Sequence, residues 1–378
     1  MALTISGVNI NGSLSAVHIP PPPPPATPLY LWAWGRNNFG QLGLGDTTNR
    51  SSPIQIGALS TWSEISGGRN HSIAVKTDGT LWSWGINING ELGQGDTTDR
   101  SSPIQIGAST TWSGISAGRQ HNLAISTNGT LWSWGRGGSG RLGVGNTTDY
   151  SSPKQVGALT TWSKIAGGES HSLAIKTDGT MWSWGNGFKG RLGLGDTTNR
   201  SSPVQVGAGT TWLNIAAGNY NSRAVKADGT MWSWGNGGYG QLGLSDNTDR
   251  SSPTQIGALT TWLSISSGQY HSMAIKTDGT MWSWGDNGSG KLGLGNTTGI
   301  SSPVQIGALT TWSKISLGST HSVAMKTDGT IWSWGAGAEG RLGLGNTTSV
   351  SSPVQVGALT TWLSVAAGSY YRLAIIEE

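Results

Sequence analysis

The ten residues KTDGTMWSWG, from Lys176 to Gly185, return unchanged from Lys276 to Gly285. From Leu31 onward the whole chain repeats seven times with a period of 50 residues, without insertion or deletion. Each copy holds three of the 21 tryptophans, and looser versions of the quoted stretch end at Gly35, Gly85, Gly135, Gly235 and Gly335. A period of this length predicts a propeller or another repeat array.

Each copy predicts four short β-strands separated by turns. Between residues 81 and 125 they are 81–85 (LWSWG), 103–107 (PIQIG), 111–116 (TWSGIS) and 121–125 (HNLAI). The first alternates, which places Trp82 and Trp84 on one strand face, where packing of the blade is their simplest role. The TDGT and TNGT joints favour hairpins because Asp-Gly and Asn-Gly tolerate positive φ. The chain is therefore predicted to be all-β, a seven-bladed β-propeller of four-stranded blades.

The two ends of the repeat region complement each other. LYLWAWG opens the first copy without the strand that normally precedes it, and YRLAII (371–376) supplies that strand at the end of the chain. Pairing of these N- and C-terminal strands would close the ring and leave no unpaired edge there. We expect a propeller over residues 29–378, a polyproline linker over 20–28 and an extended N-terminal arm over 1–19.

Composition excludes several classes of function. A formal net charge of +4 is too weak by itself to indicate nucleic acid, and the absence of cysteine excludes thiolate metal sites. No apolar run reaches 18 residues, and the N-terminus lacks the pattern of a signal peptide. The glycine-rich loops lack the ending of a P-loop. No single-copy catalytic constellation interrupts the repeat, so we expect no enzyme, no cofactor and no metal site.

Two polar registers recur and are predicted to be structural. A ring of imidazoles could suggest a metal, but Asn221 and Tyr371 stand in the same register, which favours buried histidines bonded to backbone. Aspartate and asparagine alternate in a second register, as in side-chain-to-backbone turns. The histidines are His71, His121, His171, His271 and His321, and the second register holds Asp46, Asp96, Asn146, Asp196, Asp246, Asn296 and Asn346.

The pattern LWSWG…GxLGxG…SSPxQxG…W…GxxHSxAIKTDGT resembles the regulator of chromosome condensation repeat, from Tyr30 to Ile376. The resemblance implies a seven-bladed propeller and a structural role for the histidines, and we expect a bacterial or phage-type member. Every copy has 50 residues, so the insertions expected of members that exchange guanine nucleotides on a small GTPase are missing. The tryptophan of the plant ultraviolet photoreceptor's GWRHT context is also missing. Members that inhibit β-lactamases bind through one loop-rich face, and that mode stays open.

The copies differ at one predicted face. If the strands alternate in direction, the nearly invariant GALTT and TDGT turns share one face, here called the constant face. The long loop after WSWG and the short loop before the histidine then form the opposite, variable face. Tyrosine and arginine, which binding hot spots favour, concentrate there, although free drift of exposed loops is the alternative. The predicted ligand- or partner-binding residues are Arg36, Phe39, Arg69, Arg119, Arg136, Phe188, Tyr220, Tyr239, Tyr270 and Tyr370.

The N-terminal arm is the most individual segment. Two alternating stretches around Asn11-Gly12 predict a small hairpin, which is not stable alone and so favours pairing with a partner or with copies of itself. Six consecutive prolines then predict a stiff spacer. The predicted assembly residues are Leu3, Ile5, Val8, Ile10, Leu14, Val17 and Ile19.

These features lead to two hypotheses about function. The first is a non-enzymatic display protein in a virion, as phage head decoration or tail-associated adhesin. Residues 1–28 would bind an assembly partner, and the variable face would meet a protein or a glycan. The alternative is a free protein-binding propeller, an inhibitor or regulatory scaffold, in the cytoplasm or outside the cell. Nucleic acid and membrane insertion are not expected in either.

Overall fold

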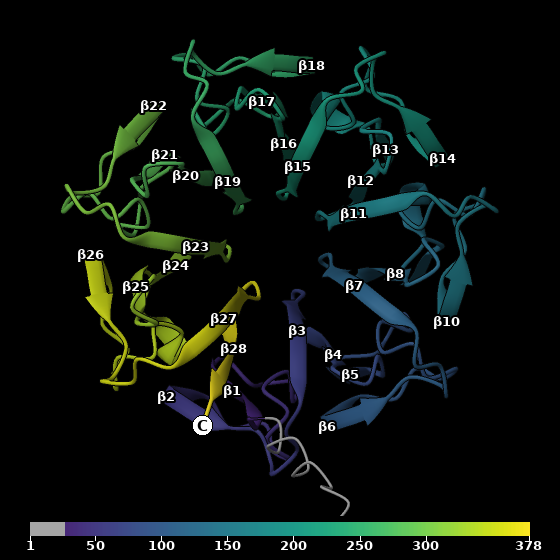
Figure 1. The fold of residues 1–378 in the computed structure, drawn as a ribbon, viewed down its shortest axis with the longest axis vertical. Coiled ribbons are helices and arrows are strands. Elements are labelled where there is room, and N and C mark those ends of the chain that lie inside the picture. The colour runs from purple at the N-terminus through teal and green to yellow at the C-terminus, as the bar shows by residue number, and fades with distance from the viewer. Residues whose placement is uncertain (1–26) are drawn as a thin grey trace, which may run out of the picture.

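The computed structural model describes residues 27–378, which form seven four-stranded antiparallel sheets around a central axis (Figure 1). Six blades are built from four consecutive strands each. The seventh combines both ends of this region, in the order β2-β1-β28-β27. The predicted seven-bladed propeller is therefore confirmed. The N-terminal arm and most of the polyproline linker lie outside the described residues.

The strands of each continuous blade run from the centre outward in chain order (Figure 1). The first blade contains β3 (Trp62–Gly67), β4 (His71–Lys76), β5 (Leu81–Gly85) and β6 (Arg100–Gln105). The second contains β7 (Trp112–Ala117), β8 (His121–Ser126), β9 (Leu131–Gly135) and β10 (Tyr150–Gln155). The third contains β11 (Trp162–Gly167), β12 (His171–Lys176), β13 (Met181–Gly185) and β14 (Arg200–Gln205). The fourth contains β15 (Trp212–Ala217), β16 (Asn221–Lys226), β17 (Met231–Gly235) and β18 (Arg250–Gln255). The fifth contains β19 (Trp262–Ser267), β20 (His271–Lys276), β21 (Met281–Gly285) and β22 (Ile300–Gln305). The sixth contains β23 (Trp312–Leu317), β24 (His321–Lys326), β25 (Ile331–Gly335) and β26 (Val350–Gln355). Three short 3-10 turns lie in long loops: η1 (Gly138–Gly140), η2 (Phe188–Gly190) and η3 (Ala338–Gly340).

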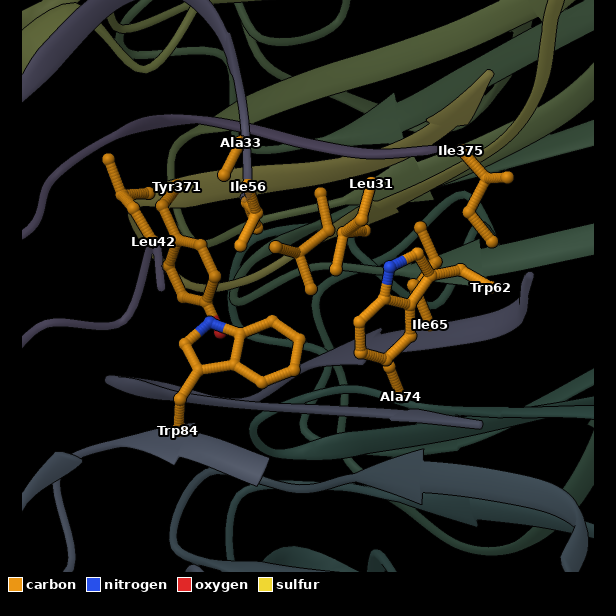
Figure 2. Packing of buried hydrophobic residues seen from close by; sticks show 11 residues of the cluster. Leu31, Ala33, Leu42, Ile56, Trp62, Ile65, Ala74, Trp84, Tyr371 and Ile375 are labelled. Carbon is orange, nitrogen blue, oxygen red and sulfur yellow. The ribbon is translucent and has the colours of Figure 1, made fainter. Parts of the chain in front are cut away.

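The seventh blade joins the two ends of the ring. It contains β1 (Leu29–Gly35), β2 (Arg50–Gln55), β27 (Trp362–Ala367) and β28 (Tyr371–Glu377). Strand β1 pairs with β28 along its whole length, from Leu29 opposite Glu377 to Gly35 opposite Tyr371. Figure 2 shows Leu31, Tyr371 and Trp84 in one buried cluster that connects this blade to the next. The predicted closure by the terminal strands is confirmed.

The Asp-Gly joints are turns, as predicted, and the next blade explains their constancy. Gly79 takes φ +78°, and its N–H donates to the Lys76 carbonyl at 2.9 Å. A Cβ at Gly79 would lie 2.1 Å from the carbonyl oxygen of Thr110, in the link that enters the next blade. Only glycine fits both the positive φ and this close approach.

The outermost strand of each blade begins earlier than predicted. Strand β6 begins at Arg100 rather than at residue 103, so the SSP motif lies inside it. Its pairing with β5 moves from Arg100 opposite Gly85 to Ile104 opposite Ser83, with an irregularity between them. Proline is tolerated there because an edge strand does not need every N–H for pairing.

The tryptophans pack the blades, as the sequence predicts. Trp84 is fully buried, and Trp82 lies edge-on to Trp62 with ring centroids 5.8 Å apart. The Lys76 ammonium lies 4.7 Å from the centroid of the Trp82 ring and covers its outer side. The repeated stretch that decides the fold is therefore a packing unit.

Neighbouring blades are joined by a repeated set of hydrogen bonds, here called the clasp. The carbonyl of Arg141, in a long loop, accepts bonds from Ser172 Oγ at 2.8 Å and Trp184 Nε1 at 2.9 Å, both in the next blade. Because the Ser172 hydroxyl donates to this carbonyl, its oxygen accepts from His121 Nε2 at 2.9 Å. The same carbonyl position is used at Gln41, Glu91, Arg191, Gln241 and Lys291.

The five described histidines belong to this clasp region. All are fully buried, and burial holds the pKa of His121 well below its usual range. The sequence predicts buried histidines that are hydrogen-bonded to the backbone. Instead, Nε2 of four of them meets a serine or asparagine side chain of the next blade, because the blades approach closely enough for side chains to meet. These pairs are His71–Asn122, His121–Ser172, His171–Ser222 and His271–Ser322. Among the described residues, Nε2 of His321 has no such partner, since the serine register of the next blade holds Arg372.

The aspartate and asparagine register forms turns, as predicted. Asp46 Oδ1 accepts from the backbone N–H of Thr48 at 2.9 Å, and Oδ2 pairs with Arg50 at 2.5 Å. The hydrogen bonds and the neighbouring guanidinium hold the pKa of Asp46 below its usual value despite partial desolvation. The carboxylate organises its own loop.

The innermost strands surround a central channel, a cavity of about 300 Å³. Glu64, on the innermost strand β3, lies half-buried beside the next blade. Burial raises the pKa of its carboxyl group to about 7, and a hydrogen bond from the backbone of Ile115 opposes this effect. The folded state therefore holds this proton more tightly than the unfolded chain.

Substitution Ser172→Ala tests the clasp. It leaves the Arg141 carbonyl without its hydroxyl donor and His121 without its acceptor, so we expect a loss of about 1–3 kcal/mol in unfolding free energy. Chemical denaturation followed by tryptophan fluorescence measures this loss. Ser252→Ala, at an exposed serine on β18, is the control and is expected to unfold like the wild type. Equal denaturation midpoints for Ser172→Ala and Ser252→Ala would contradict a stabilising role of the clasp.

Substitution Glu64→Gln tests the raised pKa. The wild-type carboxyl ionises at about pH 4.5 when unfolded and about 7 when folded, so ionisation weakens the fold as pH rises through this window. We expect Glu64→Gln to unfold at a higher midpoint than the wild type at pH 8 and to match it at pH 4. Thermal unfolding across this range measures the difference. A difference that does not depend on pH would refute the assignment.

Candidate functional site

The variable face is made of long and short loops that are bonded to one another. The backbone N–H of Arg36 donates to the Tyr370 carbonyl at 3.1 Å, and that of Ile86 donates to Asn70 at 2.9 Å. All ten predicted binding residues lie in these loops. Arg36, Phe39, Arg136, Phe188 and Tyr239 lie in long loops, and Arg69, Arg119, Tyr220, Tyr270 and Tyr370 lie in short loops.

The short loops form a collar around the mouth of the channel. The backbone N–H of Arg69 donates to the Arg119 carbonyl at 3.2 Å, and Ser319 and Ser369 are bonded in the same way at 3.1 Å. The collar is charged on one side and neutral on the other. In chain order its first residues are Arg69, Arg119, Glu169, Asn219, Gln269, Ser319 and Ser369.

Four predicted aromatic residues meet in one cluster that spans three blades. Tyr220 and Tyr270 stack with ring centroids 5.9 Å apart and an interplanar angle of 19°. Tyr239 lies 4.5 Å from Tyr270 between centroids, and 54% of its surface is exposed. The Arg191 guanidinium joins the other end, 4.9 Å from the Tyr220 centroid and 5.7 Å from that of Phe188. We call these five residues the aromatic ladder.

Tyr370 lies apart from the ladder, between two arginines. The guanidinium of Arg36 is 5.4 Å from its ring centroid, and that of Arg341 is 5.0 Å away. Glu339 pairs with both guanidiniums, at 3.5 Å from Arg36 and 2.7 Å from Arg341. The single carboxylate of Glu339 partly neutralises the two guanidiniums, and the group is largely occupied with internal contacts.

The remaining arginines gather on the other side of the collar. Burial, and the neighbouring charges of Arg69 and Arg136, lower the pKa of Arg119, which pairs with Glu169. Burial likewise lowers the pKa of Arg141 to about 10. A cavity of about 240 Å³ opens beside this group, and its lining includes Arg36, Phe39, Arg69 and Arg119. A concentration of positive charge in a hollow attracts anionic groups of a partner.

Three arginines of this face are absent from the predicted binding residues. Arg141, Arg191 and Arg341 occupy the position inside the constant GxLG motif, which resembles scaffold. The backbone carbonyls of Arg141 and Arg191 belong to the clasp. The side chains point to the variable loops: Arg191 donates to the carbonyls of Phe188 and Asn219 at 3.0 and 3.1 Å. The sequence signal for these arginines is the variation at this position, which holds glutamine, glutamate, arginine or lysine in the seven copies.

The face presents side chains of the kinds that binding surfaces use. It combines exposed aromatic rings, guanidinium groups and backbone polar groups, which are the components of protein interaction hot spots. The five described histidines are buried in blade interfaces and do not reach this face. Among residues 27–378, no three histidine, aspartate or glutamate side chains are grouped as a metal site, and none of the helices could span a membrane.

The fold matches solved propellers over nearly its full length. Yeast RCC1 (Prp20), bound to Kap60, matches with TM-score 0.84 and 22% identity over 93% of this chain and 89% of that chain. Prp20p from Saccharomyces cerevisiae, studied for binding to Gsp1p and histones, matches with TM-score 0.85 and 23% identity over 93% and 92% of the two chains. Human WBSCR16 matches with TM-score 0.84 and 23% identity over 93% and 99%.

One curated sequence relative matches locally. Protein RCC2 of Mus musculus is 37% identical over 78 residues, which are 20% of this chain and 15% of that protein. The match therefore spans a small part of either protein and supports the repeat relationship.

Family models match nearly the whole described region. The RCC1-like domain model matches residues 158–374, more than half of the chain. The model of the regulator of chromosome condensation (RCC1) repeat matches residues 30–75, 78–125 and 128–175, and a second model of this repeat matches 62–91 and 112–141. The resemblance noted from the sequence is confirmed: the chain belongs to the family of RCC1 repeat propellers.

Proposed function

We propose that this chain is a non-enzymatic protein-binding propeller that holds its partner on the variable face. The observation that carries the proposal is the aromatic ladder, in which side chains from three blades form one contiguous surface. Phe188 and Tyr239 are 55% and 54% exposed, although burial would stabilise such rings. Large aromatic side chains exposed together, beside arginine, are typical of interaction surfaces.

The relatives support this kind of function. Yeast RCC1 has been solved with Kap60, and Prp20p has been studied with Gsp1p and histones, so propellers of this fold bind proteins. Which partner this chain binds follows from its own side chains. The ladder favours aromatic or aliphatic groups, and the arginines around the 240 Å³ cavity favour carboxylates. One asymmetric partner with an acidic and an apolar part would satisfy both halves.

Paired photo-crosslinking identifies the partner and tests the face. A photoreactive phenylalanine replaces Tyr239 on the variable face or, as control, Leu259 on the constant face, which is exposed to a similar extent at 47%. We expect a protein that crosslinks from position 239 and not from 259. A partner captured equally from both positions, or only from 259, would exclude the variable face.

Affinity measurements with the captured protein then test the ladder. Tyr239→Ala and Tyr270→Ala each remove one aromatic ring from the ladder, so each should weaken binding by about 2 kcal/mol. Leu259→Ala should leave the affinity within about 0.5 kcal/mol of the wild type. Calorimetry measures all three. Wild-type affinity in both tyrosine variants would refute the proposal, and a saccharide captured in place of a protein would redirect it to glycans.

Display on a larger assembly is a second form of this function. The arm pattern of residues 1–19 and the six consecutive prolines after it favour a segment that anchors the propeller at a distance. A phage virion is the assembly that we propose, with the cytoplasm or the exterior of the cell as the location of a free form.

A truncation separates the two forms. Residues 29–378 retain all seven blades, so the truncated chain should still bind the partner of the variable face. In a display protein it should fail to co-sediment with the assembly, whereas the full chain should co-sediment. Sedimentation of both chains with purified virions is the measurement. Equal incorporation would contradict an anchoring arm.

A further inference from the structure

Two blades depart from the repeat on the otherwise constant face: the closing blade has Ile376 in the register of the covering lysines, and the β7–β10 blade departs at several positions around its tryptophans. In five blades a lysine ammonium covers the paired tryptophan rings: Lys176, for example, lies 5.1 Å from the Trp162 centroid and 3.7 Å from that of Trp182. In the β7–β10 blade the same register holds Ser126. Trp112 and Trp132 there keep their edge-on geometry, with centroids 6.0 Å apart, but have no covering cation. The five covering lysines are Lys76, Lys176, Lys226, Lys276 and Lys326.

Three further departures surround the same tryptophans. Gln94 stands where the other copies have leucine or valine, and Ser109 stands where five have leucine and one has glycine. Asn128 replaces an acidic residue found in all six other copies. Gln94, Ser109, Ser126 and Asn128 all line one cavity of about 520 Å³ with Trp112 and Trp132. Four departures that converge on one hollow indicate a site of its own.

The cavity differs from its counterpart in the neighbouring blade. The equivalent hollow beside Trp162 and Trp182 has about 330 Å³ and is lined by Val144, Leu159 and Lys154. The larger cavity has no charged side chain in its lining. Its volume lies in the range of about 300–1,000 Å³ that is typical of small-molecule sites.

The polar groups of this cavity can exchange hydrogen bonds with neutral hydroxyl groups of a ligand. Ser109, Thr111 and Ser126 form a chain of hydroxyls, with Oγ–Oγ1 distances of 3.0 Å on either side of Thr111. Asn128 Oδ1 accepts from the backbone and hydroxyl of Thr130, which directs its amide NH₂ away from the turn. Hydroxyls and amides can both donate and accept, and the neighbouring indoles offer an apolar wall.

We propose that this cavity binds a neutral pyranose ring, in a saccharide or as the terminal sugar of a glycan. A pyranose has C–H groups that pack against indole and hydroxyls that exchange hydrogen bonds with Gln94, Asn128 and the hydroxyl chain. A charged ligand would find no opposite charge in the lining, and a purely apolar one would cover Gln94, Asn128 and the hydroxyl chain without hydrogen-bonding to them. The site lies on the constant face, so it is independent of the proposed protein-binding surface.

Restoring the repeat sequence gives a test that preserves the fold. Ser126→Lys introduces the residue that five blades already carry at this position, and Gln94→Leu does the same in its own register. The control is Lys176→Ser, which uncovers the tryptophans of the next blade without its other departures. The ligands are the methyl glycosides of glucose, galactose, mannose and N-acetylglucosamine, followed by saturation-transfer NMR and calorimetry on the full chain.

We expect at least one neutral glycoside to bind, with the strongest NMR transfer to C–H protons of one ring face. Ser126→Lys should weaken this binding by about tenfold or more, because the lysine stem fills the cavity and covers the rings. Lys176→Ser should bind like the wild type. Methyl glucuronide is tested alongside the four neutral glycosides as a charged control. Failure of all four neutral glycosides to bind, unchanged affinity in Ser126→Lys, or tighter binding of methyl glucuronide than of any neutral glycoside would each overturn the proposal.

Discussion

The propeller depends on a backbone carbonyl of one blade that accepts two hydrogen bonds from the next. At Arg141 the donors are the hydroxyl of Ser172 and the indole of Trp184, and the serine in turn accepts from His121. Because the acceptor belongs to the backbone, the side chain at that position is free to vary. The loops that hold the ring together can therefore also carry the changing surface of the variable face, and arginine at this position serves both purposes.

The seventh blade contacts its two neighbours through side chains that differ from those of the other blades. Tyr371 stands in the histidine register, and its hydroxyl bonds to Ser72 Oγ at 2.8 Å and to the His71 carbonyl. Arg372 replaces the serine, donates to the Ser322 carbonyl at 2.9 Å and is fully buried. Burial of a guanidinium without an anionic partner is costly. Arg372 lies against the preceding blade and Tyr371 against the following one, while the pairing of β1 with β28 closes the ring inside the seventh blade.

Comparing equivalent positions in the seven copies separates those that serve packing from those that form the proposed binding surfaces. A register that is equal in all blades serves packing, as the TDGT turn does through the contact of Gly79 with Thr110. Registers that vary among the blades form the aromatic ladder and the arginine group. A register that departs in one blade only, as at Asn128, indicates a local site. The two proposed binding surfaces follow from the second and third kinds of position, and they lie on opposite faces.

The sequence by itself determined the number of blades, the closure by the terminal strands and the assignment of loops to two faces, because these follow from the period and from strand alternation within one copy. The tertiary structure decided the rest, because it depends on side chains about one period apart. It showed that His121 meets Ser172, that Tyr220 stacks on Tyr270, and that the edge position of β6 accommodates Pro103. It also brought Gln94 beside Trp132, since two neighbouring blades contribute to the lining of that cavity.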